Sequence, residues 1–130
     1  MRPWMGCVGV VIAALACESP IAPEAVGAWG GTSASLTLSR AGGTVQYQCG
    51  AGSIAPGWSL SESGVFAATG QHFFGGGPVP IGGRPPHPAE YSGTIIGNVF
   101  VLTVTVTDVP ATLGPFRLER DGPIVTELCV

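Results

Sequence analysis

The sequence contains no lysine and few charged residues of any kind. Lysine and arginine together number 5, all of them arginine, and charged residues make up 10% of the chain. From Cys17 onward, four arginines stand against eight carboxylates, which gives a formal charge of −4. Proteins that bind nucleic acids neutralise phosphates with Lys and Arg, so this composition excludes a nucleic-acid partner. Without lysine, Schiff-base catalysis and the phosphate-binding P-loop are excluded as well.

Sequence motifs of the common enzyme classes are also missing. The chain has no G-x-S-x-G elbow, no H-E-x-x-H and no C-x-x-C. Its carboxylates are scattered and do not indicate an acid–base pair. The sequence therefore predicts a protein that is not an enzyme and that requires no cofactor or metal.

An apolar run near the start of the chain is too short to span a membrane. It extends from Trp4 to Ala16 behind a single arginine, whereas a membrane-spanning helix needs about 20 residues. That length predicts a signal peptide over residues 1–16. Ala14-Leu15-Ala16-Cys17 resembles the bacterial lipobox, in which a signal peptidase cuts before a cysteine that carries diacylglycerol. The resemblance implies a lipid on Cys17 and a tether over 17–26; plain secretion is the alternative.

A lipid on Cys17 would place the protein in the cell envelope, with the membrane as its partner. By resemblance to lipoproteins of enteric-type bacteria, Glu18 after the cysteine leaves the outer membrane open as the destination. We therefore expect a lipid-anchored protein of the outer membrane that faces the periplasm or the surface. A secreted or periplasmic protein is the alternative.

Cys49 and Cys129 are the only cysteines that follow Cys17. In an oxidising compartment, a pair without metal-ligand spacing predicts a disulfide. Closing a loop of about 80 residues would stabilise the fold by about 4.5 kcal/mol in the chain-entropy description. A metal site or a catalytic thiol is the alternative.

Alternating apolar and polar residues predict an all-β domain over 27–130, and no window shows a helical period. Gly97-Asn98 between two apolar runs predicts a hairpin. In TVQYQC, Val45, Tyr47 and Cys49 are expected to face the core. The short turns favour an antiparallel meander of about 7–8 strands that closes into a small barrel; a β-sandwich is the alternative. The predicted strands cover 35–40, 44–49, 57–60, 65–69, 91–96, 99–108 and 114–120, with a last one in PIVTELCV, 123–130.

Residues 70–90 interrupt this pattern and are predicted to form one long loop. They include six Gly and five Pro, and proline cannot donate to a sheet ladder. Loops of this length are often functional. Phe73 and Phe74 lie in it, either as an exposed tip that binds a partner or as a plug over an open barrel end. Arg84 lies in the same segment.

Both histidines, His72 and His87, also fall in this segment. With Glu90 as the nearest third ligand they suggest a metal site, although the spacing matches no zinc signature. With Ser92 and Asp108 they suggest a catalytic trio. The alternative is that the imidazoles hydrogen-bond the loop backbone.

Gly27-Ala28-Trp29 at the start of the first strand resembles the lipocalin signature. In that family the tryptophan seals the closed end of the barrel under an arginine from the last strand, a place that Arg120 or Arg117 would take here. Thr107-Asp108 resembles the start of the family's Thr-Asp-Tyr motif, with Val109 in place of the tyrosine. The resemblance implies a carrier of a small apolar ligand. A tryptophan that packs in the core without binding a ligand is the alternative.

A second resemblance covers most of the chain after the leader. The order of its motifs is similar to that of a group of small predicted bacterial lipoproteins without an assigned activity. This resemblance implies an exported, disulfide-linked β domain and transfers no activity. The matching positions are Trp29–Gly31, Tyr47, Cys49, Gly64, Phe66, Gly76–Pro78, His87–Gly93, Leu102–Asp108, Gly114–Arg120 and Cys129.

These patterns predict an exported cell-envelope lipoprotein with a non-catalytic binding or structural role. Its expected partner, besides the membrane, is a small apolar ligand or an envelope protein. A lipocalin-like carrier is one alternative, and a metal-binding protein or hydrolase that uses His72 and His87 is another. The candidate binding residues are Trp29, His72, Phe73, Phe74, Arg84, His87 and Arg120.

Overall fold

The computed structural model describes residues 24–76 and 78–124, and these form β-strands and turns. The strands are β1 (Gly27–Gly30), β2 (Ala34–Ser39), β3 (Gly42–Tyr47), β4 (Gly50–Ile54), β5 (Ser59–Leu60), β6 (Val65–Phe74), β7 (His87–Ile96), β8 (Val99–Val106) and β9 (Ala111–Arg120). A helix long and apolar enough to cross a membrane is not found in this part of the chain.

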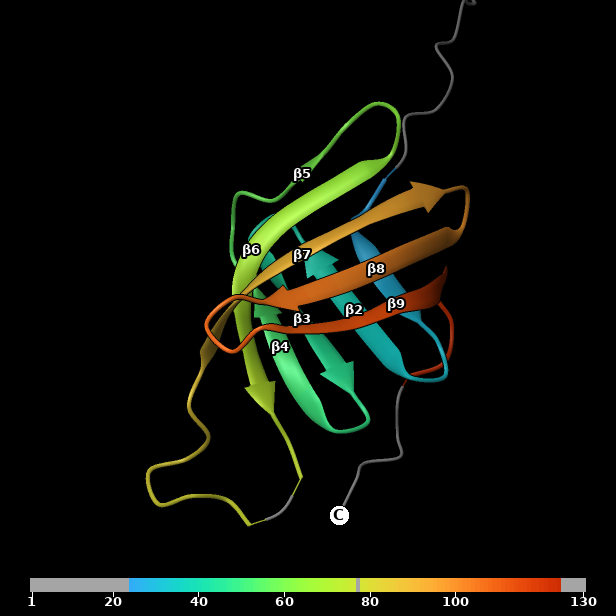
Figure 1. The fold of residues 1–130 in the computed structure, drawn as a ribbon. Coiled ribbons are helices and arrows are strands. Elements are labelled where there is room, and N and C mark those ends of the chain that lie inside the picture. Colours follow the sequence, from blue (N-terminus) through green and yellow to red (C-terminus); the bar gives the residue numbers. More distant parts are fainter. Residues whose placement is uncertain (1–23, 77, 125–130) are drawn as a thin grey trace, which may run out of the picture.

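The strands form one antiparallel sheet that closes on itself (Figure 1). Neighbours in the sheet follow the order β4-β3-β2-β1-β9-β8-β7-β6, and β4 pairs with β6 to complete an eight-stranded barrel. The short β5 is an extra strand at β6. Closure pairs the edge strands that an open sheet would expose. The predicted all-β meander and its closure into a barrel are confirmed, and the sandwich alternative is wrong.

The loop predicted over residues 70–90 is shorter than expected. β6 continues to Phe74 and β7 begins at His87, so residues 75–86 connect the two strands. Gly70 stands in the strand because the backbones approach closely there: a Cβ would come within 1.9 Å of the Ser53 carbonyl oxygen. Glycine in a strand marks such an approach as well as a turn, and composition alone does not distinguish the two.

The second correction concerns β4 and Cys49. The small residues of GAGSI (Gly50–Ile54) carry little apolar pattern, and this strand was not predicted. Gln48 and Cys49 form the turn that leads into it, so Cys49 is exposed and does not face the core. The strand predicted to begin at Gly114 also begins earlier, at Ala111.

Several expectations concern residues outside the described ranges. These are the signal peptide over 1–16, the lipid on Cys17 and the disulfide partner Cys129; most of the predicted strand over 123–130 is also outside. Within the tether predicted over 17–26, Ala25 is 1% exposed and packs in the core. The domain therefore begins before the first strand.

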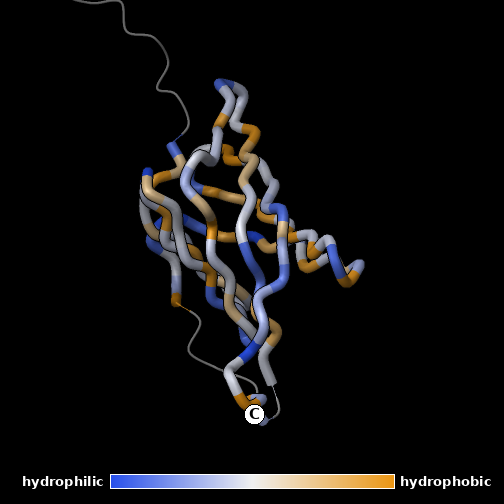
Figure 2. Tube along the Cα trace, turned by 90° about the vertical axis from the view of Figure 1, so that its left-hand side faces the viewer, coloured by the Kyte–Doolittle hydropathy of each residue, from blue (hydrophilic) through white to orange (hydrophobic). Residues whose placement is uncertain are grey.

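The barrel interior around Trp29 is filled by aromatic and aliphatic side chains. The Trp29 and Phe100 rings meet edge to face at 5.3 Å between centroids, and Phe66 meets Phe100 at 5.1 Å. Leu36, Leu102 and the rest of the buried cluster come from β1 to β9 and surround them. Along the strands hydrophobic and hydrophilic residues alternate (Figure 2), as expected where one face packs and the other meets water.

Arg120 covers Trp29 and joins the first strand to the last. The two residues are partners in the β1–β9 ladder, and the guanidinium carbon lies 4.2 Å from the indole centroid. The same guanidinium donates hydrogen bonds to the carbonyls of Val26 (3.1 Å) and Glu24 (2.6 Å), while the indole N–H donates to Ala25 (2.9 Å). Of the two arginines considered, Arg120 takes the place over the tryptophan, and Arg117 pairs with Glu119 at the surface.

The closure at Arg120 predicts a difference between two arginines of the same strand. We expect Arg120→Met to lower the free energy of unfolding by about 2–3 kcal/mol, because it removes two charged hydrogen bonds and a cation–π contact. Arg117→Met should change it by less than about 1 kcal/mol, since its ion pair is exposed. Denaturant unfolding of both variants measures the contrast, and equal losses would contradict the role given to Arg120.

Candidate functional site

The barrel end opposite to Trp29 carries the polar and aromatic side chains that the sequence singled out. Strand β8 runs from one end of the barrel to the other. Just before it, the Asn98 carbonyl accepts a hydrogen bond from the backbone N–H of Arg120 (2.9 Å), which places its start at the Trp29 end. Just after it, Asp108 contacts His87, which places its finish at the opposite end. The hairpins after β3 and β8 and the 75–86 connection lie at this second end, which we call the open end. Figure 1 shows the yellow 75–86 connection extending from it.

His72 and Phe74 occupy inward positions on β6. His72 is 1% exposed, and its ring centroid lies 4.4 Å from that of Phe74 and 5.3 Å from that of Tyr47 on β3. His87 is the ladder partner of His72 on β7, and the Phe74 ring also meets the His87 ring, at 5.1 Å. The structure therefore brings both predicted histidines and one predicted phenylalanine together inside the barrel end.

Two buried polar atoms in this cluster have no hydrogen-bond partner among the described residues: the Tyr47 hydroxyl and His72 Nδ1. The neighbouring Tyr91 is satisfied, because its hydroxyl donates to the Gln71 carbonyl at 2.6 Å. Gly52 makes room for that hydroxyl, since a Cβ there would come within 2.3 Å of it. Buried polar groups without partners are costly and rare, and water or a ligand often supplies the missing bond.

The electrostatics of the cluster favour neutral groups. Burial lowers the pKa of His72, and the imidazole of His87 lowers it further. Burial raises the pKa of Tyr47 above its usual range, with a contribution from Tyr91, and it raises the pKa of Tyr91 to about 12. Near pH 7 the interior therefore offers hydrogen-bonding groups without a net charge.

His87 and Asp108 form the polar rim of the open end. The imidazole Nδ1 lies 3.1 and 3.2 Å from the two carboxylate oxygens. The His87 side chain is 20% exposed and that of Asp108 45% exposed, so the pair meets solvent. A protonated His87 makes this contact an ion pair.

Glu90 does not join the two histidines as a metal ligand, and Ser92 does not join them as a catalytic residue. Glu90 and Ser92 lie an odd number of residues from His87 on β7, and both are exposed on the outer face. Asp108 alone of the proposed companions meets a histidine. Among residues 24–76 and 78–124, no three His, Cys, Asp or Glu side chains are grouped so as to hold a metal ion.

Phe73 and Arg84 lie outside the barrel wall. Phe73 is half-buried, and with Phe74, Cys49, Gln48 and Arg84 it borders a cavity of about 240 Å3. The Arg84 guanidinium donates to the carbonyls of Phe74 (3.4 Å) and Gly76 (3.1 Å). Phe74 thus faces the barrel end, as the plug alternative proposed, and neither phenylalanine forms an exposed tip.

Sequence reasoning missed two parts of the open end. The alternation of apolar and polar residues predicted that Tyr47 is buried. It did not predict that the Tyr47 hydroxyl has no hydrogen-bond partner, because the possible partners come from other strands. The exposed apolar residues of the connection are Val79 (65%) and Ile81 (106%), which were not singled out. Their signal was the alternation of proline and apolar residues in PVPI, residues 78–81.

Because the pKa of His72 is lowered by folding, acid should destabilise the protein through this group. Above about pH 6.5 His72 is neutral in both states; below it, the unfolded chain binds a proton that the folded chain resists. Stability should fall by up to about 1.4 kcal/mol per pH unit over that window. In unfolding measured from pH 7.5 to 5, His72→Gln should remove most of this slope and His87→Gln should keep it. A slope unchanged in His72→Gln would contradict the assignment.

Comparison of the chain with known proteins identifies no relative. No protein-family model, no curated protein and no solved structure matches the chain significantly. The candidate site therefore rests on the contacts described above: a closed end at Trp29 and Arg120, and an open end at Tyr47, His72 and His87.

Proposed function

We propose that this protein is a lipid-anchored protein of the bacterial cell envelope with a non-catalytic binding role at the open end of its barrel. The observation that carries the binding role is the pair of buried, unpartnered polar atoms, Tyr47 Oη and His72 Nδ1. Both belong to one cluster whose other walls are the aromatic rings of Phe74 and Phe116. A small ligand that fits would bring a polar group to these atoms and an apolar body to the rings.

The filled interior limits where such a ligand binds. A lipocalin-like carrier places an apolar ligand inside the barrel, whereas the space around Trp29 is occupied by Phe66, Phe100 and Leu118, each 0% exposed. The Trp29–Arg120 contact is the arrangement that the resemblance to lipocalins implies. The packing favours a site confined to the open end, rather than a deep ligand chamber.

The direction of the chain supports a site that points away from the membrane. Glu24, at the start of the described residues, is held at the closed end by Arg120. A tether that begins at Cys17 would reach the barrel from that side, and the cluster lies at the opposite end. An anchored protein would thus keep its open end accessible to solutes or to envelope proteins.

The anchor is tested by Cys17→Ser in the full-length protein expressed in a bacterial host. We expect the variant to move from the membrane fraction to the soluble envelope fraction, because a thiol is needed to carry the diacylglycerol. Cys17→Ala is a second variant that should behave in the same way. If both variants sediment with membranes as the wild type does, the protein is not held by a lipid at Cys17.

The binding role is tested by native and denaturing mass spectra of the protein purified from the host envelope. We expect an added mass in the native spectrum that disappears on denaturation and falls at least tenfold in Tyr47→Phe. That variant removes an unpartnered hydroxyl, so its unfolding free energy should be unchanged or higher. Tyr91→Phe is the comparison variant: it loses the hydrogen bond to the Gln71 carbonyl, and its unfolding free energy should fall by about 1 kcal/mol. Identical native and denatured masses would leave a structural role.

A further inference from the structure

The connection between β6 and β7 carries an apolar tip. Residues 75–83 read GGGPVPIGG, so glycine, proline, valine and isoleucine are the only residue types in this stretch. Val79 is 65% exposed and Ile81 is fully exposed, at 106%. Loops that only connect strands are usually rich in polar residues, whereas neighbouring exposed apolar side chains mark a surface that binds another molecule. We call residues 78–84 the finger.

A tight turn at the tip of the finger directs Ile81 outward. The Gly83 N–H donates to the Pro80 carbonyl (3.0 Å), and Gly82 between them has a φ of 89°. A positive φ at the third residue is the requirement of a type II turn, in which Ile81 takes the second position. A Cβ added at Gly82 or Gly83 would meet nothing within 4 Å, so the turn stands clear of the described chain.

Arg84 fixes the base of the finger. Its guanidinium Nη1 donates hydrogen bonds to the carbonyls of Phe74 (3.4 Å) and Gly76 (3.1 Å), which lie on the opposite leg of the connection. Prolines at positions 78, 80, 85 and 86 restrict the backbone φ along the segment. A segment that is already ordered loses less conformational entropy when it binds, so this finger is preorganised for a partner.

The same prolines limit how a partner can recognise the finger. Proline has no backbone N–H, so a strand of another chain cannot form a continuous ladder along this segment. Recognition must therefore come mainly from the side chains of Val79 and Ile81. A matching surface is an apolar pocket that accepts one branched side chain at its centre and a second one at its edge.

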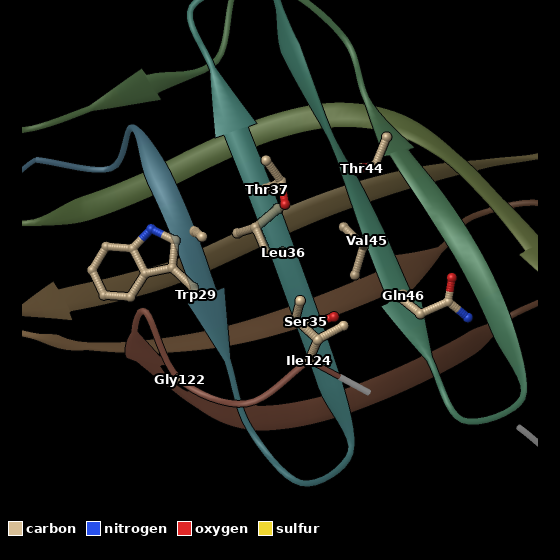
Figure 3. A pocket seen from close by; sticks show the side chains of 10 residues that line it. Trp29, Ser35, Leu36, Thr37, Thr44, Val45, Gln46, Gly122 and Ile124 are labelled. Atoms are coloured by element: carbon tan, nitrogen blue, oxygen red, sulfur yellow. The ribbon is translucent and has the colours of Figure 1, made fainter. Parts of the chain in front are cut away.

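Two other strongly exposed isoleucines lie on the barrel itself. Ile124 is 74% exposed, but with Ser35 it lines a groove of about 390 Å3 on the outer face of β1, β2 and β3 (Figure 3). Ile96 is 77% exposed and ends β7 at the closed end. Single exposed apolar side chains of this kind are common and require no function. Val79 and Ile81 differ because both stand on one projecting segment.

The finger is suited to a protein partner rather than to a lipid bilayer. Segments that insert into bilayers usually place Trp, Tyr, Lys or Arg at the boundary with water. Arg84 is the one such residue of the finger, and it binds carbonyls at the base. The finger also extends from the open end, whereas Glu24 is held at the closed end (Figure 1). This last argument rests on the anchor at Cys17 proposed above.

We propose that the finger inserts Ile81 into an apolar pocket of a second protein of the cell envelope, with Val79 packed at the edge of that pocket. This contact site is separate from the cluster of Tyr47 and His72, which lies inside the barrel. Burial of one isoleucine side chain contributes on the order of tenfold to hundredfold in affinity. The preorganised turn lets most of that gain appear as binding.

Photocrosslinking in intact host cells tests the finger. The full-length protein carries the photoreactive residue benzoylphenylalanine in place of Val79 or, as a control at the closed end, in place of Ile96. We expect the label at position 79 to form a distinct adduct with a protein of another sequence, and the label at position 96 not to form it. Adding Ile81→Ser should reduce the adduct at least tenfold. Because whole cells are irradiated, this result does not depend on a lipid at Cys17.

The captured protein is then identified by mass spectrometry and purified, and its affinity for the unlabelled protein is measured. We expect Ile81→Ser to raise the Kd at least tenfold, whereas Ile96→Ser, the matched control, should leave it within twofold. Both side chains are exposed, so both variants should unfold at the wild-type denaturant concentration. Equal affinity of Ile81→Ser and the wild type would overturn the proposal. The absence of an adduct, or adducts only with phospholipid or with a second copy of this chain, would also overturn it.

Discussion

Closure of the sheet between β1 and β9 is the constraint on which the other features depend. The ladder between them has two residue pairs, and the Arg120 guanidinium reinforces it by stacking on Trp29 and binding the carbonyls of Glu24 and Val26. An arginine suits this place, because its planar group can stack and donate several hydrogen bonds at once. Without closure, β1 and β9 would each expose an unpaired edge, and the core would open to water.

The same closure divides the barrel into two ends of different character. Around Trp29 the interior is packed with apolar side chains, among them Phe66, Phe100 and Leu118. Toward Tyr47 and His72 the interior becomes polar, and two buried atoms lack partners within the described residues. A packed apolar core at one end holds the strands in register, and this packing positions the cluster at the other end. Under the proposed function, stability and binding belong to opposite ends of one small barrel.

The polar cluster illustrates how neighbouring strands create chemistry that one strand does not have. His72 and His87 are 15 positions apart in the chain and partners in the β6–β7 ladder. Phe74 lies against both imidazoles, and Asp108 completes the rim from the far end of β8. Glu90, much nearer in sequence, is excluded from the cluster because an odd spacing on a strand turns it to the outer face.

The sequence by itself determined the fold class, the meander, the β7–β8 hairpin at Gly97-Asn98 and the burial of Trp29, Val45 and Tyr47. All but the burial of Trp29, which the resemblance to the lipocalin signature implies, follow from local periodicity or turn chemistry, which acts between residues close in the chain. Only the tertiary structure decided that residues 50–54 and 70–74 are strands, because Gly50 and Gly70 serve close approaches of backbone to backbone and Gly52 makes room for the Tyr91 hydroxyl. It also decided which arginine covers Trp29, which carboxylate meets His87 and which polar atoms stay unpaired. These depend on strand register around a closed barrel, which no local pattern specifies.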